Sequence, residues 1–279
     1  MKIYLNLLLW TTHVSEEQFT LFKTISDMGY DGVEVPLFEG SKEHYTSMSK
    51  AIKDADLSCT TVTCAGPDSN AVSNDPSTQK AAEDYLKWAV DISEILESQL
   101  LVGPFFAAHG DFSFDEPISV LRERSAKVIK NVAQYANTKD ISLSLEFLNR
   151  FETFLLNCTS DTADFLKLID ESNVGILYDT HHANIEEKSI TQAFEAHGSD
   201  FNHIHLSESH RGNLGEGQVN WEETKSALKK LTYSGNVAVE AFAHDVEGFS
   251  KVAHVWREIF SSKQDLAVKS LAFAKQFIK

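Results

Sequence analysis

Short runs of β-branched and other apolar residues alternate with longer segments of helical period, and this alternation recurs eight times along the chain. Such alternation predicts a parallel sheet whose strands are joined by helical crossovers. Eight strand-and-helix pairs within 279 residues match the size of one closed barrel. We therefore predict an α/β fold, a (β/α)8 TIM barrel, with residues 1–279 forming a single domain. The expected strands are Ile3–Leu9, Asp31–Pro36, Leu57–Thr63, Leu100–Gly103, Ile141–Phe147, Val174–Asp179, His203–Ser207 and Val237–Phe242.

Several helix starts are marked by an N-cap residue and, three positions later, a side chain that reaches back to it. These pairs are Ser15 with Gln18, Ser189 with Gln192, and Asn220 with Glu223. Apolar residues at three- and four-residue steps after Pro117 predict a helix that buries one stripe against the sheet. Residues 263–279 carry a similar stripe, so we expect this last helix to close the barrel or to contact a partner subunit.

The formal net charge of -16 limits the partners of the chain. Binding to nucleic acid or anionic lipid depends on a basic surface, so we expect neither as a partner. The same charge disfavours phosphorylated substrates without excluding them. Uninterrupted apolar runs stay well below the ~18 residues of a membrane span, and no signal-peptide pattern precedes the first strand. We therefore expect a cytoplasmic protein, in which Cys59, Cys64 and Cys158 are reduced thiols.

Four otherwise apolar strands end in a metal-ligating residue type: Glu146, Asp179, His205 and Glu240. In a barrel these strand ends converge on one point. Three carboxylates brought together repel one another unless a cation lies among them, so the set predicts a metal site. Three oxygen ligands and one imidazole suit Mn²⁺ first, with Mg²⁺ or Co²⁺ as alternatives. We expect one divalent ion per chain, because no second cluster is evident.

A second layer of polar residues follows these strand ends. We interpret Glu152, His182 and Arg211 as substrate contacts, and Phe242 as an apolar surface for the substrate. Irregular stretches at 66–76, 106–116 and 210–220 follow the third, fourth and seventh strands and are expected to wall the site. Three further residues have weaker interpretations. Arg150 and His181 are equally compatible with substrate and surface roles, and His203 is expected to face the helices. Glu34, at the end of the second strand, receives no role.

The chain resembles the ketose 3-epimerases of the tagatose and psicose type, within the xylose-isomerase-like barrel superfamily. The resemblance rests on four motifs: residues 145–152 (LEFLNRFE), 179–187 (DTHHANIEE), 203–211 (HIHLSESHR) and 239–242 (VEAF). It implies that Glu146, Asp179, His205 and Glu240 bind the metal and that Glu146 and Glu240 are also the catalytic acid/base pair. It further implies that Glu152, His182 and Arg211 bind the oxygens at the first two sugar carbons, and that the protein is a homodimer.

The predicted function is metal-dependent epimerisation of free ketohexoses at C3 through a cis-enediolate. An aldose–ketose isomerase of the hydroxypyruvate isomerase type and a keto-polyol dehydratase remain alternatives, because both use the same metal and enediolate. A multi-metal DNA-repair nuclease on the same barrel is a more distant alternative, because it requires more ligands and a basic face. A sugar-binding protein without turnover is the remaining alternative.

Overall fold

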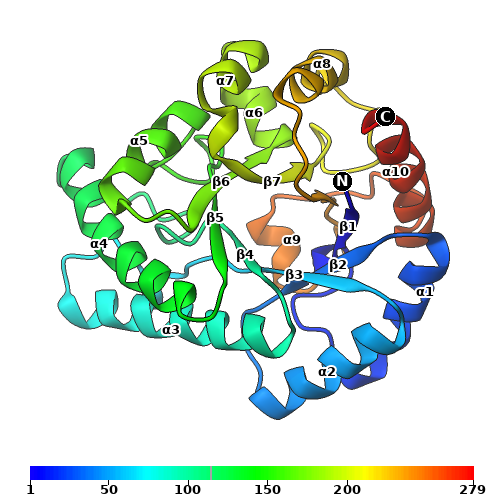
Figure 1. Cartoon of the computed structure of the whole chain (residues 1–279), viewed down its shortest axis with the longest axis horizontal. Helices are drawn as coiled ribbons and strands as arrows, with labels where there is room; N and C mark the ends of the chain where they lie inside the picture. Colours follow the sequence, from blue (N-terminus) through cyan, green and yellow to red (C-terminus); the bar gives the residue numbers. More distant parts are fainter. Residues whose placement is uncertain (114) are drawn as a thin grey trace.

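The computed structural model describes residues 1–113 and 115–279, and within them eight strands pair in chain order into a closed, all-parallel barrel (Figure 1). The strands are β1 (Ile3–Asn6), β2 (Gly32–Pro36), β3 (Ser58–Val62), β4 (Leu100–Gly103), β5 (Ser142–Glu146), β6 (Val174–Asp179), β7 (Phe201–Leu206) and β8 (Val237–Val239). Strand β8 pairs with β1 and so closes the ring. The predicted α/β barrel is confirmed.

The α-helices form an outer ring around the barrel, and α9 alone lies across its centre in this view (Figure 1). They are α1 (Thr20–Met28), α2 (Lys42–Asp54), α3 (Pro76–Ile95), α4 (Ile118–Asn137), α5 (Thr159–Ile169), α6 (Thr180–Glu186), α7 (Ile190–His197), α8 (Trp221–Leu231), α9 (Phe249–Val252) and α10 (Lys263–Phe277). The predicted helix starts are confirmed: the side chains of Ser189 and Asn220 accept hydrogen bonds at the starts of α7 and α8. At the start of the 3-10 helix Glu16–Gln18, the Gln18 side chain accepts a hydrogen bond from the Ser15 amide at 2.9 Å.

Strands β1 and β8 are shorter than predicted. The Asn6 side chain accepts a hydrogen bond from the Leu8 amide at 2.9 Å, and this cap starts a 3-10 helix over Leu7–Leu9. Strand β8 ends at Val239, although the Glu240 amide still donates to the Leu206 carbonyl at 3.0 Å. Glu240 therefore lies just beyond the carboxyl end of its strand.

Apolar side chains fill the layer between strands and helices, and the barrel interior holds polar side chains together with a second, smaller apolar cluster. On β2, Val33 and Val35 belong to the main hydrophobic cluster, and Glu34 between them points inward. Helix α10 packs against β1 and β8, so it closes the barrel. Its apolar stripe is only partly buried: Leu266 and Leu271 are buried, whereas Val268 is 51% exposed. Within residues 1–113 and 115–279, no helix has both the length and the apolar character that crossing a membrane requires.

Candidate functional site

The four predicted ligands converge at the carboxyl ends of the strands. One ligand atom from each of Glu146, Asp179, His205 and Glu240 lies within 4.8 Å of the others, and all four residues are buried. The His205 Nδ1 atom lies 3.2 Å from Glu240 Oε1, 3.4 Å from Glu146 Oε1 and 3.7 Å from Asp179 Oδ2. This convergence from β5, β6, β7 and the end of β8 is what the strand-end pattern predicts.

The donor set fits a divalent cation. His205 Nδ1 is buried and has no hydrogen-bond partner, although three carboxylate oxygens surround it. The opposite ring atom, His205 Nε2, lies 2.8 Å from Glu34 Oε1. An imidazole nitrogen held among carboxylate oxygens, with the other nitrogen bonded to a further carboxylate, is the usual arrangement of a histidine metal ligand.

The electrostatics of the cluster favour a bound cation. Burial, together with the charges of Glu240 and Glu146, raises the pKa of Asp179 to about 8, although Arg211 opposes the shift. Burial and Glu240 likewise raise the pKa of Glu146. Burial also acts on Glu240, but the neighbouring His205 and Arg211 lower its pKa. Without a cation, such a cluster takes up protons at neutral pH. A divalent ion instead stabilises the ionised carboxylates.

Asp179 has two separate tasks, one for each carboxylate oxygen. Its Oδ1 accepts hydrogen bonds from the amides of His181 (2.6 Å) and His182 (3.0 Å) and thereby caps helix α6. Its Oδ2 faces His205 and the guanidinium of Arg211. The cap therefore fixes the orientation of the oxygen that faces the cluster.

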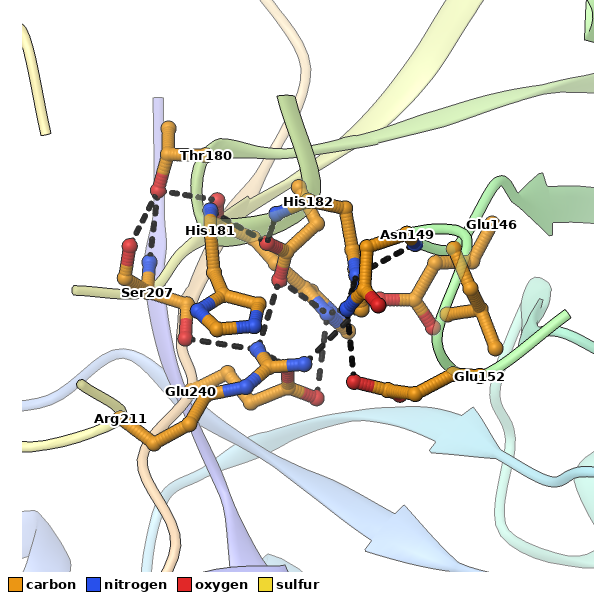
Figure 2. Close-up of polar contacts among 12 residues, drawn as sticks. Glu146, Asn149, Glu152, Thr180, His181, His182, Ser207, Arg211 and Glu240 are labelled. Carbon is orange, nitrogen blue, oxygen red and sulfur yellow. Dashed lines mark hydrogen bonds and ion pairs between the residues drawn. The ribbon is translucent and has the colours of Figure 1, made fainter. Parts of the chain in front are cut away.

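Arg211 enters the site from the loop after β7 (Figure 2). Its Nη1 donates to Glu240 Oε2 at 2.7 Å, and its Nη2 lies 2.9 Å from His182 Nε2. The guanidinium carbon lies 4.7 Å from the centre of the Phe242 ring, which places the two predicted contacts side by side. Arg211 has a φ of 62°, a left-handed conformation that is uncommon outside glycine and is concentrated at functional sites.

Glu152 and His182 lie together on the β5–β6 side of the pocket (Figure 2). Asn149 joins them, because its Nδ2 donates to Glu152 Oε1 at 2.7 Å and its amide donates to His182 Nδ1 at 3.0 Å. Burial favours the protonated form of Glu152, but the neighbouring His182 and Arg211 lower its pKa. His109 Nε2 lies 3.2 Å from Glu152 Oε2. The sequence interpretation did not single out His109, although its position in the predicted wall at 106–116 was a usable signal.

The predicted walls at 66–76 and 210–220 differ in whether they line the pocket. The stretch at 210–220 contributes Arg211, whereas residues 66–76 do not line the pocket. Asn70 instead supports the neighbouring loop by accepting a hydrogen bond from the Ala108 amide at 3.1 Å. Within the stretch at 106–116, Phe114 lies outside the described residues.

The prediction that His203 faces the helices is wrong. Side chains two positions apart on a strand point to the same face, so His203 and His205 both point into the barrel. His203 Nε2 lies 2.9 Å from Glu34 Oε2. Arg150 is a surface residue whose guanidinium is paired with Glu186, and His181 Nδ1 lies 3.2 Å from the Glu208 carbonyl oxygen.

Two further groups of potential ligands lie nearby, contrary to the expectation of one cluster: Glu34, His203 and His205, and Glu152, His181 and His182. The oxygens of Glu34 already have four side-chain partners. In the second group, His182 Nδ1 already accepts from the Asn149 amide, and the oxygens of Glu152 already contact Asn149 and His109. The arrangement therefore still favours a single ion at the first cluster.

The pocket next to the cluster has two unlike sides. Polar side chains come from helix α6 and from the loops after β4, β5 and β7: His109, Glu152, His182 and Arg211. The opposite side is formed by Leu8, Phe38, Val62, Phe249 and Val252. Thr63 also lines the pocket, but its hydroxyl is already bonded to the Leu37 carbonyl (2.7 Å) and lies 2.6 Å from Tyr85 Oη. A bound polyol therefore has polar partners mainly on one side.

Known proteins share this architecture. Residues 22–276 match the family described as xylose isomerase-like TIM barrel. A ketose 3-epimerase from Arthrobacter globiformis is 29% identical, over 99% of this chain and 96% of that protein. An L-ribulose 3-epimerase from Methylomonas sp. (strain DH-1) is 30% identical, over 89% of this chain and 87% of that protein. The crystal structure of a D-allulose 3-epimerase from Methylomonas sp. in complex with D-allulose has a TM-score of 0.94 at 27% identity, covering 99% of this chain and 96% of that one.

The family match covers most of the chain, and the similarity to the 3-epimerases extends over nearly its full length. These matches confirm the resemblance indicated by the four sequence motifs. The chain belongs to the xylose isomerase-like TIM barrel family, among its ketose 3-epimerases.

Proposed function

We propose that this protein epimerises free ketohexoses at C3 through a cis-enediolate, with Glu146 and Glu240 as the catalytic acid/base pair. The observation that carries the proposal is the placement of two carboxylates around one point. Glu240 and Glu146 lie 3.2 Å and 3.4 Å from His205 Nδ1, and they come from strands separated by β6 and β7. Inversion at a carbon requires two proton carriers on its two faces, and the placement of this pair supports that role.

The residues that would hold the divalent ion are Glu146, Asp179, His205 and Glu240. When bound, such an ion supplies the positive charge that makes the C3 proton of a 2-ketose acidic. One glutamate removes this proton, and the other gives a proton to the opposite face of C3. Asp179 stays oriented by its cap on α6 and takes no part in the transfer.

Glu152, His182 and Arg211 are proposed to bind the oxygens at the first two carbons of the sugar. These three line the pocket beside the cluster, together with His109. Phe242 packs against Arg211 and offers an apolar face to the sugar. The remaining carbons then lie along Leu8, Phe38 and Phe249. An apolar wall of this kind favours a free sugar over a phosphorylated one, because a phosphate group requires charged or hydrogen-bonding partners.

Further parts of the proposal rest on less specific grounds. The hard oxygen-rich ligand set favours Mn²⁺, with Mg²⁺ or Co²⁺ as alternatives, and one ion per chain. Residues 1–279 are proposed to act as one domain, in a cytoplasmic homodimer. The net charge of -16 argues against nucleic acid and membrane surfaces as partners. Sedimentation of the purified protein at micromolar concentration tests the dimer, and a monomer would remove that part of the proposal.

Product analysis tests the reaction. The manganese-loaded protein is incubated with D-allulose, D-fructose, D-tagatose and L-ribulose, and the products are separated by chromatography. We expect each turned-over ketose to yield its C3 epimer. Formation of an aldose would identify an aldose–ketose isomerase, and a dehydrated product would identify a dehydratase. Absence of any product with all four ketoses, despite bound metal, would contradict the proposal.

A further inference from the structure

We propose that Glu34 of β2 is a positioning residue for the metal centre, because it holds His205 with Nε2 protonated and Nδ1 directed at the ion. The inference rests on the metal site of the proposed function and goes beyond it, since Glu34 lies behind the ligands. Glu34 is fully buried and has a His205 nitrogen 2.8 Å from its Oε1 atom. Its carboxylate therefore contacts the edge of the His205 ring that faces away from the cluster.

The hydrogen bonds of Glu34 define its ionisation state and the proton on His205. Its oxygens face four groups, which are Asn6 Nδ2 (3.1 Å), Thr60 Oγ1 (3.0 Å), His203 Nε2 (2.9 Å) and His205 Nε2 (2.8 Å). The Asn6 Nδ2 group can only donate a hydrogen bond, and the Thr60 hydroxyl donates its hydrogen to Glu34 Oε2. An ionised carboxylate accepts all four bonds, so both histidines carry a proton on Nε2. His205 Nδ1 is then the nitrogen available to a metal, and it is the atom that lies among the three carboxylates.

The barrel register explains why these groups meet. Asn6 pairs with Glu34 across β1 and β2, and Glu34 pairs with Thr60 across β2 and β3. Register partners in a parallel sheet lie at the same level, so these three side chains point into the barrel together. Asn6 Nδ2 also donates to Glu240 Oε1 at 3.0 Å. Glu34 is thus connected to two proposed ligands, directly to His205 and through Asn6 to Glu240.

The variant Glu34→Gln tests this role with a nearly unchanged shape. Both carboxylate oxygens of Glu34 face N–H or O–H donors, so the amide group of a glutamine opposes a donor in either orientation. Loss of the outer partner of a histidine ligand typically weakens metal binding by about 10- to 100-fold. We expect a loss of that size here. Thr60→Val is the matched control, because it removes one donor to the same carboxylate and leaves His205 in place.

The experiment measures the dissociation constant of Mn²⁺ for the full chain. Bound metal is first removed with a chelator, the protein is then titrated with Mn²⁺, and electron paramagnetic resonance records the signal of the free ion. Glu34→Gln is expected to raise the constant by about 10- to 100-fold, and Thr60→Val by clearly less. Equal constants for wild type and a folded Glu34→Gln variant would overturn the role of Glu34. A wild type that binds no divalent ion would overturn the metal centre itself, and the role of Glu34 with it.

A second measurement needs no variant and therefore does not depend on the folding of Glu34→Gln. Nitrogen-15 spectra of the Mg²⁺-loaded wild-type protein report which nitrogen of His205 carries the proton. We expect a one-bond N–H coupling at Nε2 and none at Nδ1. A proton on Nδ1 with an unprotonated Nε2 would overturn the inference, whatever the metal affinity.

Discussion

Replacing Glu240 with glutamine should damage both metal binding and proton transfer. Glu240 Oε2 accepts from Arg211 at 2.7 Å, and its Oε1 accepts from Asn6 at 3.0 Å. Because both oxygens face donors, the glutamine amide opposes an N–H group in either orientation. The substitution also removes one of three carboxylate charges around His205 Nδ1. Metal affinity should fall by at least the roughly 10- to 100-fold that loss of an outer partner causes, and kcat by about 10²- to 10⁴-fold through loss of a proton carrier.

Glu152→Gln provides the contrast. Glu152 accepts from Asn149 and contacts His109, and it is not among the four clustered ligands. A glutamine keeps an oxygen for Asn149 and loses a charged partner for the sugar. We expect kcat/KM to fall roughly 10- to 150-fold, since a hydrogen bond to a charged group contributes about 1.5–3 kcal/mol, while metal content stays normal. Metal analysis and steady-state kinetics on both variants check the pair. If Glu152→Gln loses the metal while Glu240→Gln keeps metal and activity, the roles are reversed and the two-faced proton transfer is refuted.

Three further predictions concern the substrate contact and the metal. Phe242→Leu removes the ring that packs against Arg211, a contact that contributes about 0.5–2 kcal/mol, and should therefore raise KM by about 2- to 30-fold. An unchanged KM would contradict the proposed role of Phe242 in substrate binding. Mn²⁺ should bind more tightly as pH rises from 6 to 8, because burial and the neighbouring glutamates raise the pKa of Asp179 to about 8 and the ion displaces its proton. Calorimetry that shows pH-independent affinity would contradict this linkage. Metal analysis should give one divalent ion per chain, whereas two or three tightly bound zinc ions would favour the nuclease alternative.

The sequence predicted the barrel and the ligand cluster because both depend on simple periodicities. Apolar strands that each end in Glu, Asp or His necessarily meet at one end of a closed parallel barrel. The same rule of alternation was misapplied at His203, which shares the inward face with His205. The role of Glu34 was hidden, because its partners lie on β1, β3 and β7 and only the barrel register brings them together.

The positions where a strand-end residue also caps the following helix were harder to predict. Asp179 caps helix α6 and also faces the cluster, so its identification as a ligand obscured the helix start that it marks. Asn6 caps Leu7–Leu9 in the same way and ends β1 within a run whose other residues are apolar. His109 and Asn149 lie in loops, where no periodicity indicates which side chains turn inward.

Solvent deuterium incorporation tests the central claim most directly. The manganese-loaded protein is incubated with D-allulose in D₂O, and nuclear magnetic resonance locates the deuterium in the recovered sugars. Proton transfer by Glu146 and Glu240 predicts that deuterium enters C3 as the C3 epimer forms, and that Glu240→Gln suppresses both. Deuterium at C1 with formation of an aldose, or epimer formation without deuterium at C3, would contradict the account.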